Sequence, residues 1–111
     1  MSAFSRKVAQ EYKGRKSRVV HVPEWELDIH VFPLTLGQLA RINEETDPIK
    51  RIVRVLMVRA KQENGEPLFD VEDAETLVSQ GVGCFGPDVV TRVCAELGEV
   101  DFPDEAQAEK N

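Results

Sequence analysis

Two histidines and a nearby carboxylate are the residues of this chain that could bind a metal ion. His21, His30 and Asp28 fall within one short stretch, and imidazole nitrogens with a carboxylate oxygen are ligands that zinc accepts. Structural zinc sites take four ligands, however, and further hydrogen bonds orient those ligands. This stretch supplies two nitrogen ligands and one oxygen ligand, so we interpret it as a solvated His–Asp pair and expect no metal or other cofactor.

A second candidate for chemistry is the glycine-rich segment that starts at Gly81. Gly81, Gly83 and Gly86 have the G-x-G-x-x-G spacing, which binds dinucleotide phosphates where it follows a strand and opens a helix. Here the preceding residues 74–80 have a helical pattern, and only 25 residues follow Gly86. Pro87 would also remove one of the amides that a helix N-terminus offers to phosphate. The spacing therefore predicts a flexible connection between two helices, which could act as a hinge.

The two cysteines are candidate nucleophiles without evident partners. Cys84 lies in the glycine-rich segment, where it could be accessible, but a catalytic thiol needs a base and a group that orients the base. The only histidines, His21 and His30, lie in a different part of the chain. Cys94 fits a small buried residue of a helix. These patterns predict a protein that is not an enzyme and has no catalytic residues.

The charge of the chain argues against nucleic acid as a partner. The 111 residues carry a net charge of −6 at pH 7, whereas phosphate binding needs a basic surface. Residues 6–18 hold six cations and one anion, and residues 99–111 hold five anions and one cation. We expect a basic N-terminal arm over residues 1–17, a globular domain over residues 18–98 and an acidic flexible tail over residues 99–111. The two ends are either solvated or in contact with neighbouring copies, head to tail.

The hydropathy pattern of the sequence indicates the cellular compartment of the protein. The chain has no apolar run near the ~20 residues that a membrane span needs. Its first ten residues lack the apolar core of a secretory signal. We therefore expect a cytosolic protein that contacts no membrane, in which Cys84 and Cys94 are free thiols.

Periodicity predicts an α+β fold that is mostly helical, with one N-terminal two-stranded antiparallel β-hairpin and about four helices after it. Alternating apolar residues over residues 18–32 predict the hairpin. We expect it to pair Val22 with Leu27, Val20 with Ile29, His21 with Asp28, and Val19 with His30. The expected helices cover residues 5–12, 36–45 and 47–61, a segment capped by Asp70, and residues 87–97.

The stretch with the most regular helical spacing is residues 47–61. Asp47 suits a helix cap, and Pro48 suits the first position, where the missing proline N–H would be unpaired anyway. The apolar residues then predict one broad buried stripe, formed by Ile49, Ile52, Val53, Leu56, Met57 and Ala60. In the neighbouring helices, Leu36 and Val78 are expected to face inward.

Two apolar residues of this stretch, Val55 and Val58, fall outside the stripe. One interpretation is a core helix packed on most sides. The other is a helix that contacts a partner through Val55, Val58, Arg51 and Arg54. Trp25, in the predicted turn of the hairpin, also has two interpretations, as a lid over the core or as an interface anchor, because tryptophan is enriched in such anchors.

Short motifs along residues 18–97 carry a family resemblance. They are Val22-Pro23-Glu24-Trp25 before a strand, Leu34-Thr35-Leu36-Gly37 after it, Gly65-Glu66-Pro67-Leu68-Phe69, and then Asp73-Ala74 and Leu77. In these motifs, and in the order of hairpin, paired helices, turn and final helices, the chain resembles tail assembly chaperones of long-tailed, siphovirus-like bacteriophages. That family has no catalytic residues to transfer to this chain.

The resemblance implies a small protein of the host bacterial cytoplasm that is made during virion assembly and is absent from the finished virion. It implies binding and solubilisation of the tape measure protein, and help in recruiting tail tube subunits around it. Self-association of several copies along the long partner would account for the oppositely charged ends. Many members of the family are made in two lengths by a ribosomal frameshift, and the acidic tail here could be the end of a short form.

We expect the contacts with a partner to come from Trp25, Val55, Val58, Arg51, Arg54, Val82, Cys84 and Phe85. One alternative function is a structural tail subunit or head–tail connector subunit that stays in the virion. A second alternative is a small non-enzymatic regulatory binding module unrelated to phage.

Overall fold

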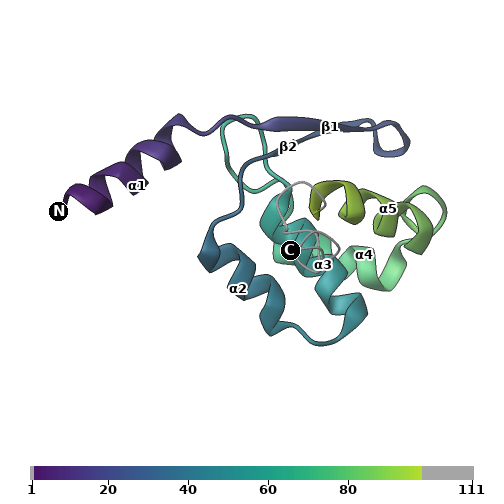
Figure 1. The fold of residues 1–111 in the computed structure, drawn as a ribbon. Helices are drawn as coiled ribbons and strands as arrows, with labels where there is room; N and C mark the ends of the chain where they lie inside the picture. The colour runs from purple at the N-terminus through teal and green to yellow at the C-terminus, as the bar shows by residue number, and fades with distance from the viewer. Residues whose placement is uncertain (1, 99–111) are drawn as a thin grey trace, which may run out of the picture.

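The computed structural model describes residues 2–98, and its elements follow the predicted order (Figure 1). The α-helices are α1 (Ala3–Gly14), α2 (Leu36–Glu44), α3 (Pro48–Arg59), α4 (Val71–Gln80) and α5 (Pro87–Gly98). The other elements are the strands β1 (Arg18–Val22) and β2 (Leu27–Val31) and the short 3-10 helices η1 (Pro23–Trp25) and η2 (Gly83–Phe85). This mostly helical α+β architecture confirms the predicted fold class. The predicted acidic tail, residues 99–111, lies outside the described residues.

The hairpin confirms the predicted pairing. Val20 lies opposite Ile29, Val22 opposite Leu27, His21 opposite Asp28 and Val19 opposite His30. Because side chains alternate along a strand, Val20 and Ile29 fall on a buried face, whereas His21 and Asp28 are exposed on the other. Helix η1 and Glu26 join the strands, and Glu26 adopts a φ of 52° in the left-handed region.

The core lies between the apolar face of the hairpin and the helices α3 and α5. Its buried side chains are Val20, Val22, Trp25, Ile29, Val31, Leu56, Ala60, Val90, Val93, Cys94 and Leu97. Helix α2 packs on α3 and buries Ile42 completely. Removal of these apolar side chains from water is the main favourable contribution to folding of a domain of this size.

The chain that follows α3 extends the sheet at β2. The His30 amide donates to the Lys61 carbonyl at 2.9 Å, and the Lys61 amide donates to the His30 carbonyl at 3.0 Å. A tight turn follows, in which Gly65 adopts a φ of 88° that glycine tolerates without steric cost. This turn confirms the prediction at Asn-Gly, and it returns the chain to Leu68, whose amide donates to the Ala60 carbonyl at 3.2 Å.

Side-chain caps start the helices where the sequence predicts. The Asp47 carboxylate accepts hydrogen bonds from two amides in the first turn of α3. Reciprocal capping boxes start α2 and α4, where the side chains of Thr35 and Asp70 each accept from the amide three residues further on. Each cap gives partners to amides that a helix start otherwise leaves unpaired.

The buried stripe of α3 is shorter than predicted. Leu56 and Ala60 are buried, but Ile49 is 64% exposed, because it lies in the first turn beside the loop from α2, where no described element covers it. Two other residues predicted to face inward are also exposed. Leu36 begins α2, and Val78 faces a hollow between α3 and α4 that is open to solvent.

One charged side chain of α3 is buried. Arg59 is 2% exposed, and its Nε donates to the carbonyl of Leu97 at 3.4 Å. Burial, followed by the nearby charge of Arg18, lowers the pKa of Arg59 to about 10. The guanidinium therefore stays charged at neutral pH and ties α3 to the end of α5.

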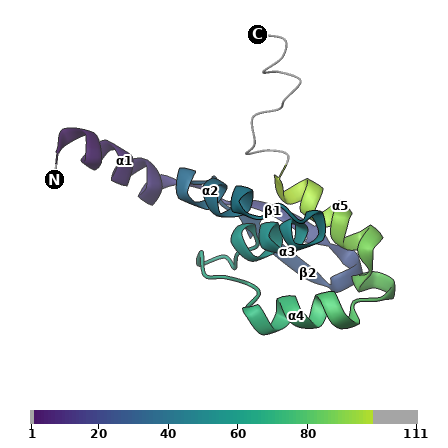
Figure 2. The ribbon, with the colours of Figure 1, turned by 90° about the horizontal axis from the view of Figure 1, so that it is seen from below.

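Helix α1 stands apart from the other elements. It begins after a Ser2 cap, and none of its residues is buried. Figures 1 and 2 show it extending away from the hairpin and the remaining helices. The helix is longer at both ends than the predicted residues 5–12. None of the helices in residues 2–98 is long and apolar enough to cross a membrane.

Leu97→Ala should destabilise the protein strongly. Leu97 is fully buried, and truncation of such a side chain leaves a cavity that costs about 2–5 kcal/mol. Leu36→Ala is the matched control, because Leu36 is 86% exposed and its truncation should change the free energy of unfolding by no more than about 0.5 kcal/mol. Urea unfolding followed by circular dichroism measures both variants. Equal losses would contradict this assignment of the core.

Candidate functional site

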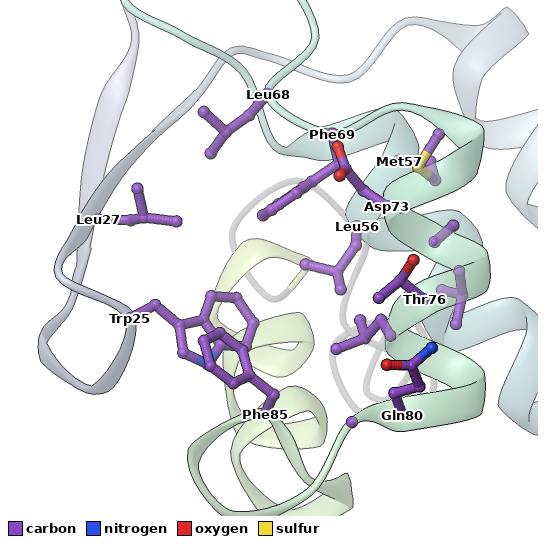
Figure 3. A pocket seen from close by; sticks show the side chains of 14 residues that line it. Trp25, Leu27, Leu56, Met57, Leu68, Phe69, Asp73, Thr76, Gln80 and Phe85 are labelled. Atoms are coloured by element: carbon purple, nitrogen blue, oxygen red, sulfur yellow. The ribbon is translucent and has the colours of Figure 1, made fainter.

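An apolar groove lies between the tip of the hairpin, α3 and α4 (Figure 3). Its volume is about 550 Å³, which is enough for a small ligand or for several side chains of a protein partner. The lining residues are Trp25, Leu27, Val53, Leu56, Met57, Leu68, Phe69, Asp73, Ala74, Thr76, Leu77, Gln80, Gly81 and Phe85. Asp73 is the only charged residue among these described lining residues, so the groove suits apolar groups.

Trp25 forms the wall at the hairpin end of the groove. Its side chain is 9% exposed, and its indole N–H donates to the Cys84 carbonyl at 2.5 Å. The indole stacks on the Phe85 ring with centroids 5.7 Å apart, and it meets the Phe69 ring edge-on at 6.4 Å. Such aromatic pairs each contribute about 0.5–1.5 kcal/mol beyond the burial of their area. One side chain therefore connects the hairpin, η2 and the segment before α4.

An ion pair ties the hairpin tip to α5. The Arg92 guanidinium donates to the carboxylate of Glu24 in η1. A hydrogen bond from its own backbone amide, followed by the bond from Arg92, lowers the pKa of Glu24 below its usual value. Glu24 is therefore charged at neutral pH and helps to hold the turn that carries Trp25.

The glycine-rich segment lies at the same end of the groove as Trp25, and Gly81 and Phe85 line the groove there. It connects α4 to α5, as predicted, and a helix rather than a strand precedes it. A methyl group at Gly81 would lie 2.4 Å from the Leu77 carbonyl oxygen and 2.6 Å from the Phe85 carbonyl oxygen, which is closer than real side chains approach. Gly83 adopts a left-handed φ of 62°. The glycines therefore serve a tight connection and not a dinucleotide fingerprint.

Helix α4 is acidic, and one of its carboxylates, that of Asp73, lines the groove. Helix α4 carries Glu72, Asp73 and Glu75 and no basic residue. A partner would meet an apolar floor beside an acidic helix, an arrangement that favours apolar side chains accompanied by cations.

Four of the predicted contact residues gather at this groove. Trp25 and Phe85 line it. Val82, which is 76% exposed, and the exposed Cys84 lie in the same short segment as Phe85. The structure therefore brings the hairpin turn and the glycine-rich segment together at one surface, and their contact with a partner stays a prediction.

The other predicted contact residues lie on α3, outside the groove lining. Val55 and Val58 are half-buried, and Val55 packs against the core. Arg51 is exposed and donates to the side-chain oxygen of Asn43 at 2.8 Å. This hydrogen bond links α3 to α2, so Arg51 has a partner within the fold.

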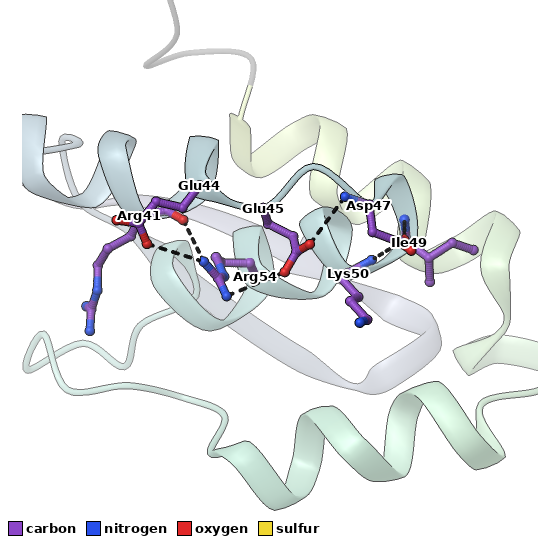
Figure 4. Close-up of polar contacts among 7 residues, drawn as sticks. All are labelled: Arg41, Glu44, Glu45, Asp47, Ile49, Lys50 and Arg54. Atoms are coloured by element: carbon purple, nitrogen blue, oxygen red, sulfur yellow. Dashed lines mark hydrogen bonds and ion pairs between the residues drawn. The ribbon is translucent and has the colours of Figure 1, made fainter.

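Arg54 also joins α3 to the end of α2 (Figure 4). Its guanidinium donates to the Arg41 carbonyl at 2.9 Å and lies 3.8 Å from Glu44 and 3.6 Å from Glu45. Partly exposed ion pairs of this kind each contribute about 0–1 kcal/mol. Both arginines therefore make contacts within the fold, and their contact with another protein stays a prediction.

The histidine stretch forms the expected His–Asp pair. The Nδ1 atom of His21 lies 2.6 Å from Oδ1 of Asp28, and both side chains are well exposed. His30 instead lies 3.3 Å from the hydroxyl of Ser17. Across residues 2–98, no group of three or more His, Cys, Asp or Glu side chains is arranged to hold a metal ion.

The sequence patterns do not reveal that an open groove forms. Leu68 and Phe69 pack against the core as half-buried residues, and both also line the groove. One signal was present: Phe69 directly precedes the Asp70 cap, and an apolar residue in that position packs against the fourth helical residue, here Ala74. Both Phe69 and Ala74 line the groove.

Comparison with known proteins gives one informative similarity. No protein family model and no curated protein sequence matches the chain. Among solved structures, the chain is similar to the tail assembly chaperone of bacteriophage HK97, with a TM-score of 0.53 and 17% sequence identity. The match covers 90% of this chain and 99% of that chain. The chain therefore has the fold of a tail assembly chaperone, which confirms the resemblance of the short motifs at the level of the fold.

Gly81→Ala should destabilise the protein by at least about 1 kcal/mol, because the added methyl group would overlap two backbone oxygens. Gly37→Ala is the matched control. Its methyl group would lie 3.9 Å from the nearest atom, Thr35 Oγ1, and alanine favours a helix over glycine by up to about 1 kcal/mol. Urea unfolding measures both changes. A neutral Gly81→Ala variant would contradict the close approach at this turn.

Thiol titration tests the burial of the two cysteines. Cys84 is exposed, whereas burial raises the pKa of the Cys94 thiol to about 12, and the thiolate is the reactive form. A chromogenic disulfide reagent should therefore modify Cys84 alone in the native chain and both cysteines in denaturant. Cys84→Ser should abolish the native reaction. Rapid modification of both native thiols would show that the packing of α5 against the core does not shield Cys94.

Proposed function

We propose that the protein is a tail assembly chaperone of a long-tailed bacteriophage, with a binding role and not a catalytic one. In this proposal it acts in the host bacterial cytoplasm during virion assembly and is not retained in the virion. The observation that carries the proposal is the fold shared with the HK97 tail assembly chaperone over 90% of the chain. The apolar groove supplies a place on that fold for a client.

The proposed client is the tape measure protein, a long helical protein whose apolar stripes need cover in water. An apolar groove receives the apolar face of an amphipathic helix, with side chains at i, i+4 and i+7 as anchors. Leu56 and Leu77 would contact those anchors from the floor of the groove. Trp25 and Phe85 would supply the large aromatic contacts that dominate the binding energy of many interfaces.

Binding of the tape measure protein in the groove would also assist tail assembly. A tape measure protein kept soluble along its length can serve as the template for recruiting tail tube subunits. Several copies of the chaperone would then sit along one client, so contacts between neighbouring copies also belong to the proposal. We assign Val55, Val58, Arg51 and Arg54 of α3 to contacts of this second kind, in addition to the contacts that Val55, Arg51 and Arg54 make within the fold.

Co-expression with the tape measure protein of the same phage tests the proposal, followed by a solubility assay and a pull-down. The wild-type chain should make the client soluble and co-purify with it in several copies. Thr76→Trp fills the groove from α4, because Thr76 is exposed and lines it, and it should reduce the co-purified client at least about tenfold. Ser79→Trp adds the same side chain on a face of α4 outside the lining, and it should bind as the wild type does.

Two results would contradict the proposal in different ways. Normal client binding by Thr76→Trp would place the contact outside the groove. Failure of the wild-type chain to bind, together with its detection in purified virions by mass spectrometry, would favour a structural tail or connector subunit.

A further inference from the structure

Helix α1 carries an apolar stripe that stays exposed, although Arg15 stacks on the ring of Tyr12 at one end of it. Phe4, Val8 and Tyr12 follow at i, i+4 and i+8, so they share one face of the helix. Their exposed fractions are 75%, 54% and 53%. Three large apolar side chains in a row on an exposed helix are typical of a surface that binds a partner.

The same helix is basic. Its cations are Arg6, Lys7 and Lys13, its one anion is Glu11, and Arg15 and Lys16 follow directly after it. Helix α1 is therefore an amphipathic helix with an apolar stripe and an excess of positive charge. This is the chemistry that an apolar groove beside an acidic helix favours, and Asp73 of that helix lines the groove.

We propose that α1 of one copy docks in the apolar groove of a second copy of this chain. Helix α4, which forms one wall of that groove, carries three anions and no cation. The charges would orient the incoming helix, and burial of its apolar stripe against residues such as Leu77 and Phe85 would stabilise the contact. The two surfaces lie on different parts of the chain, so the contact joins copies head to tail or exchanges two arms within a dimer.

The two surfaces also match in length. Tyr12 lies eight positions after Phe4 in the helix, which corresponds to about 12 Å along the helix axis. Helix α4 has 10 residues and is therefore about 15 Å long. The whole stripe fits along this wall of the groove.

The geometry favours a second copy over folding back within one chain. Arg15 donates to the Tyr12 carbonyl at 2.5 Å, and its guanidinium lies 3.8 Å from the Tyr12 ring centroid and 4.8 Å from the Phe32 ring centroid. These contacts hold α1 in a direction that leads away from the rest of the chain (Figures 1 and 2). Helix α1 joins the hairpin at Arg18, whereas the groove lies at the opposite end of the hairpin beside η1.

Docking would regulate access to the groove, and this consequence rests on the proposed function. A neighbouring α1 would cover the apolar groove before a client arrives. A client helix would then have to displace α1, so client binding and this self-association would compete. The docking itself needs no client and can be measured on the chain alone.

Sedimentation velocity on the purified full-length chain tests the docking without any phage partner, so its outcome is independent of the chaperone assay. The wild-type chain should self-associate with a Kd on the order of 10–100 µM, as expected for a contact smaller than a standard interface. Val8→Glu places a charge in the apolar contact and should weaken association at least about tenfold. Gln10→Glu adds the same charge on the opposite face of α1 and should have a much smaller effect.

The groove side is tested by Thr76→Arg, which adds a cation to the lining and should also weaken association at least about tenfold. Ser79→Arg is its control on the non-lining face of α4. A mixture then separates the two halves of the contact. Val8→Glu retains an intact groove and Thr76→Arg retains an intact α1, so the two variants should form a 1:1 complex although neither associates alone.

Three results would overturn the proposal: a wild-type chain that stays monomeric at about 1 mM, a Val8→Glu variant that associates as the wild type does, or a mixture that stays monomeric. High salt should weaken the wild-type contact severalfold, because it screens exposed charges. An unchanged affinity at high salt would count against the proposal as well. Circular dichroism of each variant confirms that the chain remains folded.

Discussion

The burial of one indole ring holds the groove in shape. Trp25 sits on a three-residue turn at the tip of a two-stranded hairpin, an arrangement with little stability of its own. Its single hydrogen bond and two ring contacts join segments that are far apart in the chain. The acceptor at Cys84 is a backbone carbonyl, which any residue supplies, whereas Phe69 and Phe85 must be aromatic to make the ring contacts. The groove therefore depends on aromatic packing more than on the charges beside it.

Features that depend on near neighbours in the chain were predictable from the sequence. A one-residue slip in the hairpin would bury His21 and Asp28 and expose Val20 and Ile29, so the alternation fixes one register. The cap at Asp47 could be placed for the same reason, because a cap acts on amides within three residues of it. The α+β class follows from these local rules.

Features that depend on distant segments were not predictable. Periodicity assigns Ile49 to a face of its helix, but it does not say how far the neighbouring elements extend over that face. The same limit applies to the groove. The patterns identify Trp25, Phe69 and Phe85 as apolar, but three segments must meet before one can see that a space stays open between them. The sequence therefore predicts Trp25 and Phe85 as contact residues, but it does not predict the groove that both of them line.

The position of α5 in the core has a consequence for how the protein is made. Arg18 at the start of β1 donates to the carbonyl of Glu96 at 2.8 Å, and Leu97 fills the core beneath the hairpin. Contacts between such distant residues form only after α5 has left the ribosome. The hairpin and the first helices therefore emerge during translation with their apolar faces bare. The core closes only once α5 has been made, so an arrest of translation before α5 would release a fragment that cannot close its core.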